Sequence, residues 1–298
     1  YDAGSYGILV SSDSTVGGNI TNSGEIIAGD AGIAVYSSSE VSGSITNSEG
    51  ASITGGSGIW VSDTSTVDGD VVNDGIIDVT GEESAGVWAT QSTINGSIIN
   101  SSTGTIDAEH GGILVSSSSI VGGDIVNNGE ITSEGVEVTG TYSAMVMGDV
   151  TNSLLDIEED SGMGIVVGSN TTVMGDVTNN GDINAASNGI LVSYSSIVGG
   201  DFTNSGEIDA GEDGIHVFDS SEIQGNITNS GDIIAGQDGI DVYGGITVKG
   251  DITNSVGATI DAESIGIYVH AWSEVGDITN SGIIDAGTDG IHVFNSSE

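Results

Sequence analysis

The stretch Gly200-Asp201-Phe202-Thr203-Asn204-Ser205-Gly206-Glu207-Ile208 decides the fold of this chain, because close versions of it recur along the whole sequence. Its asparagine returns at nearly constant steps, between 25 positions (Asn204 to Asn229) and 27 positions (Asn73 to Asn100). The recurring positions are Asn22, Asn47, Asn73, Asn100, Asn127, Asn152, Asn179, Asn204, Asn229, Asn254 and Asn280. A fixed period of this size over a whole chain indicates structural units stacked one on another.

Each repeat contains short bursts in which apolar and polar residues alternate. In the repeat 200–224, Ile215-His216-Val217 is one burst and Glu207-Ile208-Asp209-Ala210 is another. Alternation with a period of two is typical of strands with one buried face, and the glycines between bursts mark corners. The strict six-residue rhythm of left-handed β-helices is missing. We therefore predict an all-β fold, a single-stranded right-handed parallel β-helix of about eleven to twelve coils with three short strands per coil.

The repeats predict one continuous solenoid over residues 1–298. A partial coil spans 1–17, and the following coils start near residues 18, 43, 69, 96, 123, 148, 175, 200, 225, 250 and 276. The opening Tyr1-Asp2-Ala3-Gly4 matches Ile284-Asp285-Ala286-Gly287, so the chain enters in the middle of a coil. Natural solenoids carry polar caps. We expect this one to be uncapped at both ends, and either to continue in a longer chain or to stack on other copies.

The recurring asparagines are expected to form a structural ladder inside the solenoid. Each lies two residues after an inward apolar residue, as Asn204 does after Phe202, so its side chain points inward as well. Amides stacked along the axis can hydrogen-bond to one another and to backbone groups at the corner, which satisfies polar atoms that would otherwise be buried without partners.

A second burst, Gly-Ile-x-Val, recurs with constant flanks and a variable middle residue, so the middle residue is expected to point outward. In one repeat Ala144-Met145-Val146-Met147 takes its place. Over six consecutive coils the middle residue is apolar, and a contiguous apolar stripe marks an interface. We predict lateral packing through Trp60, Trp88, Leu114, Val146, Val166 and Leu191.

The charge of the chain excludes several classes of partner. The 298 residues include 44 acidic residues and one basic residue, Lys249, for a formal charge of −43. Nucleic acid is excluded because the chain has no cations with which to displace phosphate counterions. No apolar run approaches the ~18 residues of a membrane span, so no membrane insertion is expected. Cysteine is absent, which excludes disulfides and thiolate-metal sites.

Acidic residues recur at equivalent outward positions, where carboxylates ~4.8 Å apart repel by about 1 kcal/mol even at the dielectric constant of water. Bound cations would relieve this repulsion, and calcium accepts several carboxylate oxygens in flexible geometry. No cofactor is required, and if an ion binds these columns, calcium is the expected one. The candidate ligands are Asp124, Asp149, Asp176, Asp201, Asp209, Asp213, Asp285 and Asp289. Solvated acids that keep the protein soluble are the favoured interpretation of these columns, and specific calcium sites are the alternative.

Catalytic residues are not expected. Polysaccharide lyases use Arg or Lys to neutralise the substrate carboxylate and to take a proton, and this chain has Lys249 alone. The near-constant length of the repeats also leaves no long corner loops to wall a cleft. The histidines, His110, His216, His270 and His292, are expected to be surface residues. A polysaccharide-active β-helix enzyme is a remote alternative.

The phrase Gly-Asp-Ile-Thr-Asn-Ser-Gly-x-Ile, followed by Gly-Ile-x-Val and a Ser/Thr run, resembles the repeats of bacterial autotransporter passengers and large surface adhesins, over essentially the whole chain. The resemblance implies a secreted or cell-surface protein, in which this segment is a shaft or a fibre-forming part of an adhesin or extracellular filament. Its implied partners are further copies of itself, a longer chain, and surface glycans or host surfaces. A calcium-dependent S-layer or matrix component is the alternative.

Overall fold

The computed structural model describes residues 5–81, 84–139, 143–153, 157–159 and 162–295. These residues form short strands and turns with no helix, and the strands pair in parallel with their counterparts one repeat away. The predicted all-β parallel β-solenoid is therefore confirmed. The chain divides into two compact units, residues 1–148 and 149–298, and each is described by itself. The predicted continuity of one solenoid through both units stays a prediction.

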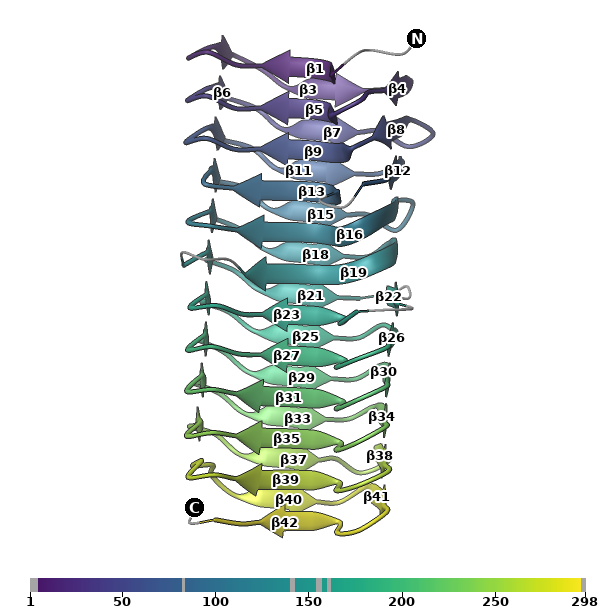
Figure 1. Ribbon diagram of the computed structural model, residues 1–298, viewed down its shortest axis with the longest axis vertical. Helices are drawn as coiled ribbons and strands as arrows, with labels where there is room; N and C mark the ends of the chain where they lie inside the picture. Colours follow the sequence, from purple (N-terminus) through teal and green to yellow (C-terminus); the bar gives the residue numbers. More distant parts are fainter. Residues whose placement is uncertain (1–4, 82–83, 140–142, 154–156, 160–161, 296–298) are drawn as a thin grey trace. The chain divides into compact units, whose positions relative to one another are not determined.

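One turn of the second unit shows the plan of all the others. It has four strands, which define faces 1 to 4: β29 (Phe202–Asn204), β30 (Glu207–Ala210), β31 (Ile215–Phe218) and β32 (Glu222–Ile223). Three strands per coil were predicted, so the prediction was wrong by one short strand. As the chain descends in Figure 1, face 3 strands run leftward in front and face 1 strands rightward behind, which makes the coil right-handed as predicted.

In the first unit, face 1 holds β3 (Ile20–Asn22), β7 (Ile45–Asn47), β11 (Val71–Asn73), β15 (Ile98–Asn100) and β18 (Ile125–Asn127). Face 2 holds β4 (Glu25–Ile27), β8 (Ser52–Gly55) and β12 (Ile76–Val79), and face 3 holds β1 (Tyr6–Val10), β5 (Ala31–Val35), β9 (Ser57–Val61) and β13 (Ala85–Thr90). The long strands β16 (Thr105–Ser116) and β19 (Glu130–Thr139) run through both of these faces. Face 4 holds β2 (Thr15–Val16), β6 (Glu40–Val41), β10 (Thr66–Val67), β14 (Thr93–Ile94), β17 (Ile120–Val121) and β20 (Met145–Val146).

In the second unit, face 1 adds β21 (Val150–Asn152), β25 (Val177–Asn179), β33 (Ile227–Asn229), β37 (Ile252–Asn254) and β40 (Ile278–Asn280) to β29. Face 2 adds β22 (Ile157–Glu159), β26 (Ile183–Ala185), β34 (Asp232–Ala235), β38 (Thr259–Ala262) and β41 (Ile283–Ala286) to β30. Face 3 adds β23 (Ile165–Val167), β27 (Ile190–Val192), β35 (Ile240–Tyr243), β39 (Ile267–His270) and β42 (Ile291–Val293) to β31, and face 4 adds β24 (Thr172–Val173), β28 (Ile197–Val198) and β36 (Thr247–Val248) to β32.

The core is built from aliphatic residues that lie over their counterparts. In the turn that starts near residue 200, Phe202, Ile208, Ile215 and Ile223 are all fully buried. Phe202 pairs with Ile227 in the next turn, and Thr203 and Asn204 pair with the Thr and Asn that follow. Full burial of one such side chain contributes roughly 1.5–3 kcal/mol. The inward positions in the sequence are therefore the ones that hold each turn on the next.

The asparagine ladder is confirmed in both units. Asn204 Nδ2 donates to Asn229 Oδ1 at 2.9 Å, and Asn229 Nδ2 donates to Asn254 Oδ1 at the same distance. In the first unit Asn22 and Asn47 are joined in the same way. Asn204 Nδ2 also donates to the carbonyl oxygen of Gly206 at 3.1 Å, which ties the ladder to the corner.

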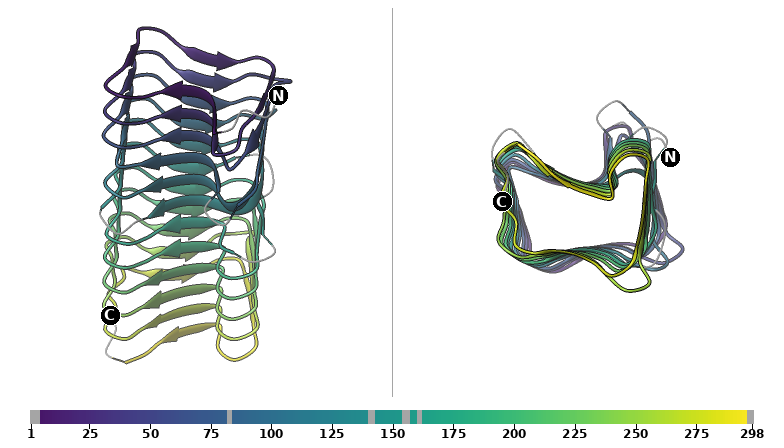
Figure 2. Two further views of the ribbon diagram at one scale, coloured as in Figure 1. Left: turned by 45° about the horizontal axis from the view of Figure 1, so that its top comes forward. Right: turned by 90° about the horizontal axis from the view of Figure 1, so that it is seen from below.

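Face 3 is concave. Figure 2 shows that the corner after face 2 projects beyond face 3 in the cross-section of a turn. The glycine of Gly-Ile-x-Val lies where the backbone bends inward: a Cβ atom on Gly214 would lie 2.3 Å from Ile233 Cγ2 and 2.7 Å from the carbonyl oxygen of Gly239. Outward side chains of face 3 are therefore shielded by the corner beside them, as Leu191 is with 7% exposure.

One repeat was aligned wrongly from the sequence. Val146 is not an outward residue of face 3, because it pairs with Val121 in face 4 and is fully buried. The residue opposite Leu114 is Glu137, which lies between buried Val136 and Val138. Residues 135–138 are thus the copy of Gly-Ile-x-Val in this turn. The apolar character of Val146 fits an inward position of face 4 as well as the predicted outward position of face 3, so it did not distinguish these two faces.

Candidate functional site

The concave face of the second unit carries polar residues at neighbouring positions. His216 of β31 pairs in register with Asp241 of β35, and Asp241 pairs with Tyr268 of β39. His270 lies two residues beyond Tyr268 on the same strand, opposite Tyr243. The stacking of successive turns therefore brings an imidazole and a carboxylate together from residues one repeat apart, and adds a second imidazole from the turn below.

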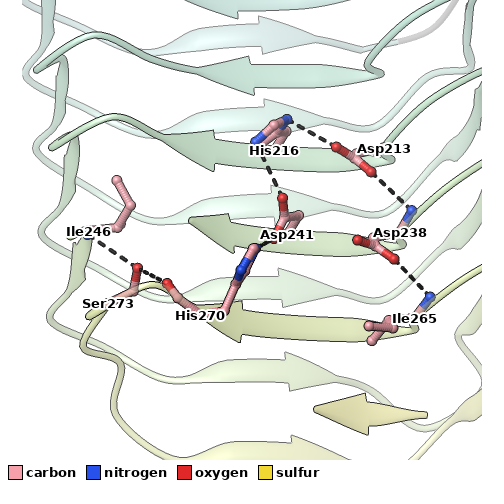
Figure 3. Close-up of polar contacts among 8 residues, drawn as sticks. All are labelled: Asp213, His216, Asp238, Asp241, Ile246, Ile265, His270 and Ser273. Atoms are coloured by element: carbon pink, nitrogen blue, oxygen red, sulfur yellow. Dashed lines mark hydrogen bonds and ion pairs between the residues drawn. The ribbon is translucent and has the colours of Figure 1, made fainter. Parts of the chain in front are cut away.

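Asp213, His216, Asp241 and His270 form what we call the His–Asp cluster (Figure 3). His216 Nδ1 donates a hydrogen bond to Asp213 Oδ2 at 3.0 Å. On the other side of the ring, His216 Nε2 lies 3.3 Å from Asp241 Oδ2. The second oxygen, Asp241 Oδ1, lies 3.0 Å from His270 Nε2. A single carboxylate thus lies between two imidazoles.

The corner that holds Asp213 is fixed by hydrogen bonds from turn to turn. Asp213 Oδ1 accepts the backbone N–H of Asp238 at 2.9 Å, and Asp238 Oδ1 accepts the N–H of Ile265 at 2.8 Å. The N–H of Asp213 itself donates to Asn188 Oδ1 at 3.2 Å. Asp213 and Asp238 therefore each cap the backbone of the next turn, and the oxygen of Asp213 that faces His216 is held in place.

The electrostatic surroundings shift the pKa values of three members. Burial raises the pKa of Asp241 to about 7, although the nearby His216 acts to lower it. Burial lowers the pKa of His216, but the hydrogen bond to Asp213 and the charge of Asp241 outweigh it, so that the pKa of His216 is raised. Burial lowers the pKa of His270. The Asp241 side chain is only 9% exposed, which explains why burial dominates its pKa.

Aromatic rings hold the second imidazole. The His270 ring stacks on Tyr268 with centroids 3.7 Å apart and an interplanar angle of 5°, and on Tyr243 with centroids 4.7 Å apart. Because the ring is packed against both tyrosines, its Nε2 is directed at Asp241. His216 and His270 were expected to be surface residues, but their side chains are only 19% and 20% exposed. The concavity of face 3, which the sequence does not reveal, accounts for this error.

His292 repeats the first half of the cluster. Its Nδ1 lies 3.0 Å from Asp289 Oδ2, as His216 lies from Asp213, and both pairs have the spacing Asp-Gly-Ile-His. The side chains of His292 and Asp289 are 36% and 59% exposed. Among the described residues, Asp213, His216 and Asp241 are the one group of three potential metal ligands whose atoms all lie within 4.8 Å of one another.

The predicted calcium ligands have a structural role that the sequence did not reveal. Asp149 Oδ1 accepts the N–H of Asp176 at 2.9 Å, Asp176 Oδ1 accepts the N–H of Asp201 at 2.7 Å, and Asp201 Oδ1 accepts the N–H of Asn226 at 2.8 Å. This acidic column therefore caps backbone amides. Asp124 occupies the same corner in the first unit, where its own N–H donates to Ser97 Oγ at 3.1 Å.

The remaining calcium candidates lie in different surroundings. Asp209 borders a hollow of about 280 Å³ together with Asp261 and Glu263. Asp285 and Asp289 are exposed. Among the described residues, Asp213 is the one calcium candidate that belongs to the His–Asp cluster. Calcium binding stays a prediction, and the donor atoms that the structure brings together include imidazole nitrogen as well as oxygen.

The apolar stripe is only partly exposed. Val166 and Leu191 are only 5% and 7% exposed. The prediction that these two side chains are accessible to a partner was therefore wrong. Trp60, Trp88 and Leu114 are half-buried. The two tryptophan rings lie 6.0 Å apart and border a hollow of about 420 Å³. A lateral interface through these three residues stays a prediction.

Comparison of the chain with protein-family models, with curated proteins and with solved structures finds no match. The part of the chain that the structure describes holds no helix with the length and apolar character needed to cross a membrane. The His–Asp cluster was missed in the sequence, although a signal was present. When the Gly-Ile-x-Val bursts are aligned one below another, His216 lies directly over Asp241.

Proposed function

We propose that this chain is a structural segment, a shaft or fibre-forming part of a secreted or cell-surface protein such as an adhesin or an extracellular filament. The observation that supports it most is the regular stacking within each unit, in which the same inward residues and the same amide ladder recur from turn to turn. Because each turn contacts only its neighbours, length increases with the number of repeats and the cross-section stays constant. That property suits a spacer.

The surface chemistry is consistent with such a role. A formal charge of −43 favours solubility and suppresses non-specific association with other acidic surfaces. The acids at the corners are compatible with the fold because many of them cap backbone amides, as Asp176 and Asp201 do. The proposed partners are further copies of the chain or further repeats, together with surface glycans or host surfaces reached by the segment.

A duplication of repeats tests the proposal. We insert a copy of residues 175–249 after Lys249, which adds three whole repeats in register. Three turns at about 4.8 Å each should lengthen the particle by about 14 Å and leave its cross-section unchanged, as measured by small-angle X-ray scattering. The control is an insertion of the same length made of Gly and Ser. The proposal is contradicted if the duplicated repeats unfold, or if they widen the particle instead of lengthening it.

The location of the protein needs a separate experiment. Antibodies raised against the 298-residue chain should label intact cells of the source organism, or the material that these cells release. Labelling that requires permeabilised cells would contradict the proposed surface or secreted location. The repeat-duplication experiment tests the architecture of the segment and not its location, so either experiment can fail without the other.

A further inference from the structure

We propose that the His–Asp cluster binds a divalent transition-metal ion of the zinc class, with His216 Nε2 and Asp241 Oδ2 as the direct protein ligands. Its two direct ligands are not among the calcium candidates suggested by the sequence, and the site does not depend on the proposed function of the segment. Solvent on the concave face would supply the remaining ligands.

The first support is an imidazole nitrogen that no hydrogen bond accounts for. His216 Nε2 is buried and has no hydrogen-bond partner among the described residues, although Asp241 Oδ2 lies 3.3 Å away. Two ligands that are each about 2.0–2.1 Å from a tetrahedral zinc ion lie about 3.3 Å apart. The separation of the two atoms therefore fits two ligands of a common ion, whereas their relative orientation does not fit a hydrogen bond.

The second support is that each ligand is held by a partner on its other side. His216 Nδ1 lies 3.0 Å from Asp213 Oδ2, and in the neutral ring with its proton on Nδ1 the lone pair of Nε2 is directed toward Asp241. Metal-binding histidines typically donate their second nitrogen to a carboxylate in this way. Asp241 is oriented in turn by His270, which lies 3.0 Å from its Oδ1 and is packed against two tyrosines.

The third support is the charge of the site. Three carboxylates lie at this site: Asp241 is on concave face 3, and Asp213 and Asp238 are at the corner beside it. The chain's single basic residue, Lys249, is bound elsewhere, to Glu222 on face 4. A bound cation would neutralise carboxylates that burial otherwise disfavours in their charged form. Imidazole is a preferred ligand of zinc, copper and nickel, whereas calcium and magnesium prefer oxygen ligands throughout.

Titration of the metal-free protein with Zn²⁺ tests the proposal. We expect one Zn²⁺ per chain by isothermal titration calorimetry, and a rise in the melting temperature that Ca²⁺ at the same concentration does not produce. His216→Ala and Asp241→Asn should each weaken Zn²⁺ binding at least tenfold. Asp213→Asn should weaken it by about tenfold, because it removes the group that orients His216. Asp241→Asn keeps the size of the side chain and removes a buried charge, so this variant should fold.

His292→Ala is the matched control, because His292 has the same Asp-Gly-Ile-His setting but a more exposed position. It should bind Zn²⁺ as the unaltered chain does. Electron paramagnetic resonance with Cu²⁺ should show coupling to a histidine nitrogen, and His216→Ala should remove it. The proposal is overturned if the unaltered chain shows no saturable Zn²⁺ binding, if His216→Ala and Asp241→Asn both bind as tightly as the unaltered chain, or if Ca²⁺ stabilises the protein as much as Zn²⁺ does.

Discussion

Replacement of Asn204 by alanine should lower the free energy of unfolding by about 3 kcal/mol. The Asn204 side chain is fully buried, donates to Asn229 Oδ1 at 2.9 Å and accepts from Asn179 Nδ2 at 2.9 Å. Alanine removes both bonds and leaves two buried amide atoms of the neighbouring turns without this partner. Each buried polar group left unsatisfied costs about 1–3 kcal/mol. The midpoint of urea denaturation, followed by circular dichroism, measures the change.

Thr203→Ala is the control for this variant. Thr203 is the preceding residue on the same strand, but its side chain points outward and is half-buried. Its replacement should change the free energy of unfolding by no more than about 0.5 kcal/mol. If the two variants were equally stable, the amide ladder would contribute nothing to the stacking of turns, and the structural role given to the recurring asparagines would be wrong.

Replacement of Gly214 by alanine should cost about 3 kcal/mol, at the upper end of the range for overpacked cores. The added Cβ would lie 2.3 Å from Ile233 Cγ2 and 2.7 Å from the carbonyl oxygen of Gly239 in the next turn. That oxygen accepts the backbone N–H of Ile215 at 3.0 Å, a bond that joins the two turns. Relief of these contacts requires two neighbouring turns to move apart. Thermal denaturation of the purified variant measures the loss.

Gly18→Ala is the comparison for Gly214→Ala, since a Cβ on Gly18 would meet no atom within 4 Å. Alanine there should leave stability unchanged or raise it by up to about 1 kcal/mol, because it restricts the unfolded chain. Equal losses at both positions would show that close approach at the bend is not what selects glycine. The concave shape of face 3 would then need another cause.

Much of the fold could be predicted because the same local pattern of buried and exposed residues recurs in each repeat. Alternation in Ile215-His216-Val217 identifies an inward pair, and its recurrence once in every repeat places each pair over the next. The asparagine ladder follows from the same count, because Asn204 lies an even number of residues from Phe202. Both inferences use only the two-residue period of a strand and the length of one turn.

The features that were missed depend on contacts between turns. The fourth strand is two residues long, as in Glu222–Ile223, and is too short to show alternation. The concavity of face 3 arises where Gly214 meets Ile233, and neither residue signals it alone. Outward acids such as Asp176 were interpreted only as repelling charges, because a backbone N–H of the next turn is not visible as a hydrogen-bond donor in a sequence.

The cluster on the concave face was missed for a related reason. The sequence places His216 and Asp241 in successive repeats, and their contact follows only once the register of β31 and β35 is known. His270 is harder to predict, because it reaches Asp241 diagonally from the next turn and depends on packing against Tyr243 and Tyr268. Sites of this kind are properties of stacking and not of any single repeat.

A pair of cysteines at Thr203 and Thr228 tests most directly whether each repeat forms one turn that lies in register on the next. The chain has no cysteine of its own, and these two outward residues are paired in the structure. Adjacent strands lie about 4.8 Å apart, within the range of about 4.4–6.8 Å that a disulfide spans between Cα atoms. The control is a second variant with cysteines at Thr203 and Thr253, which are two turns apart, at about 9.6 Å, and too far for a disulfide.

Under mild oxidation of the two folded variants, mass spectrometry should find the 203–228 disulfide within single chains of the first variant and no 203–253 disulfide within single chains of the second. Failure of the first pair to cross-link, or equal cross-linking of both pairs, would contradict the stacking of one repeat per turn.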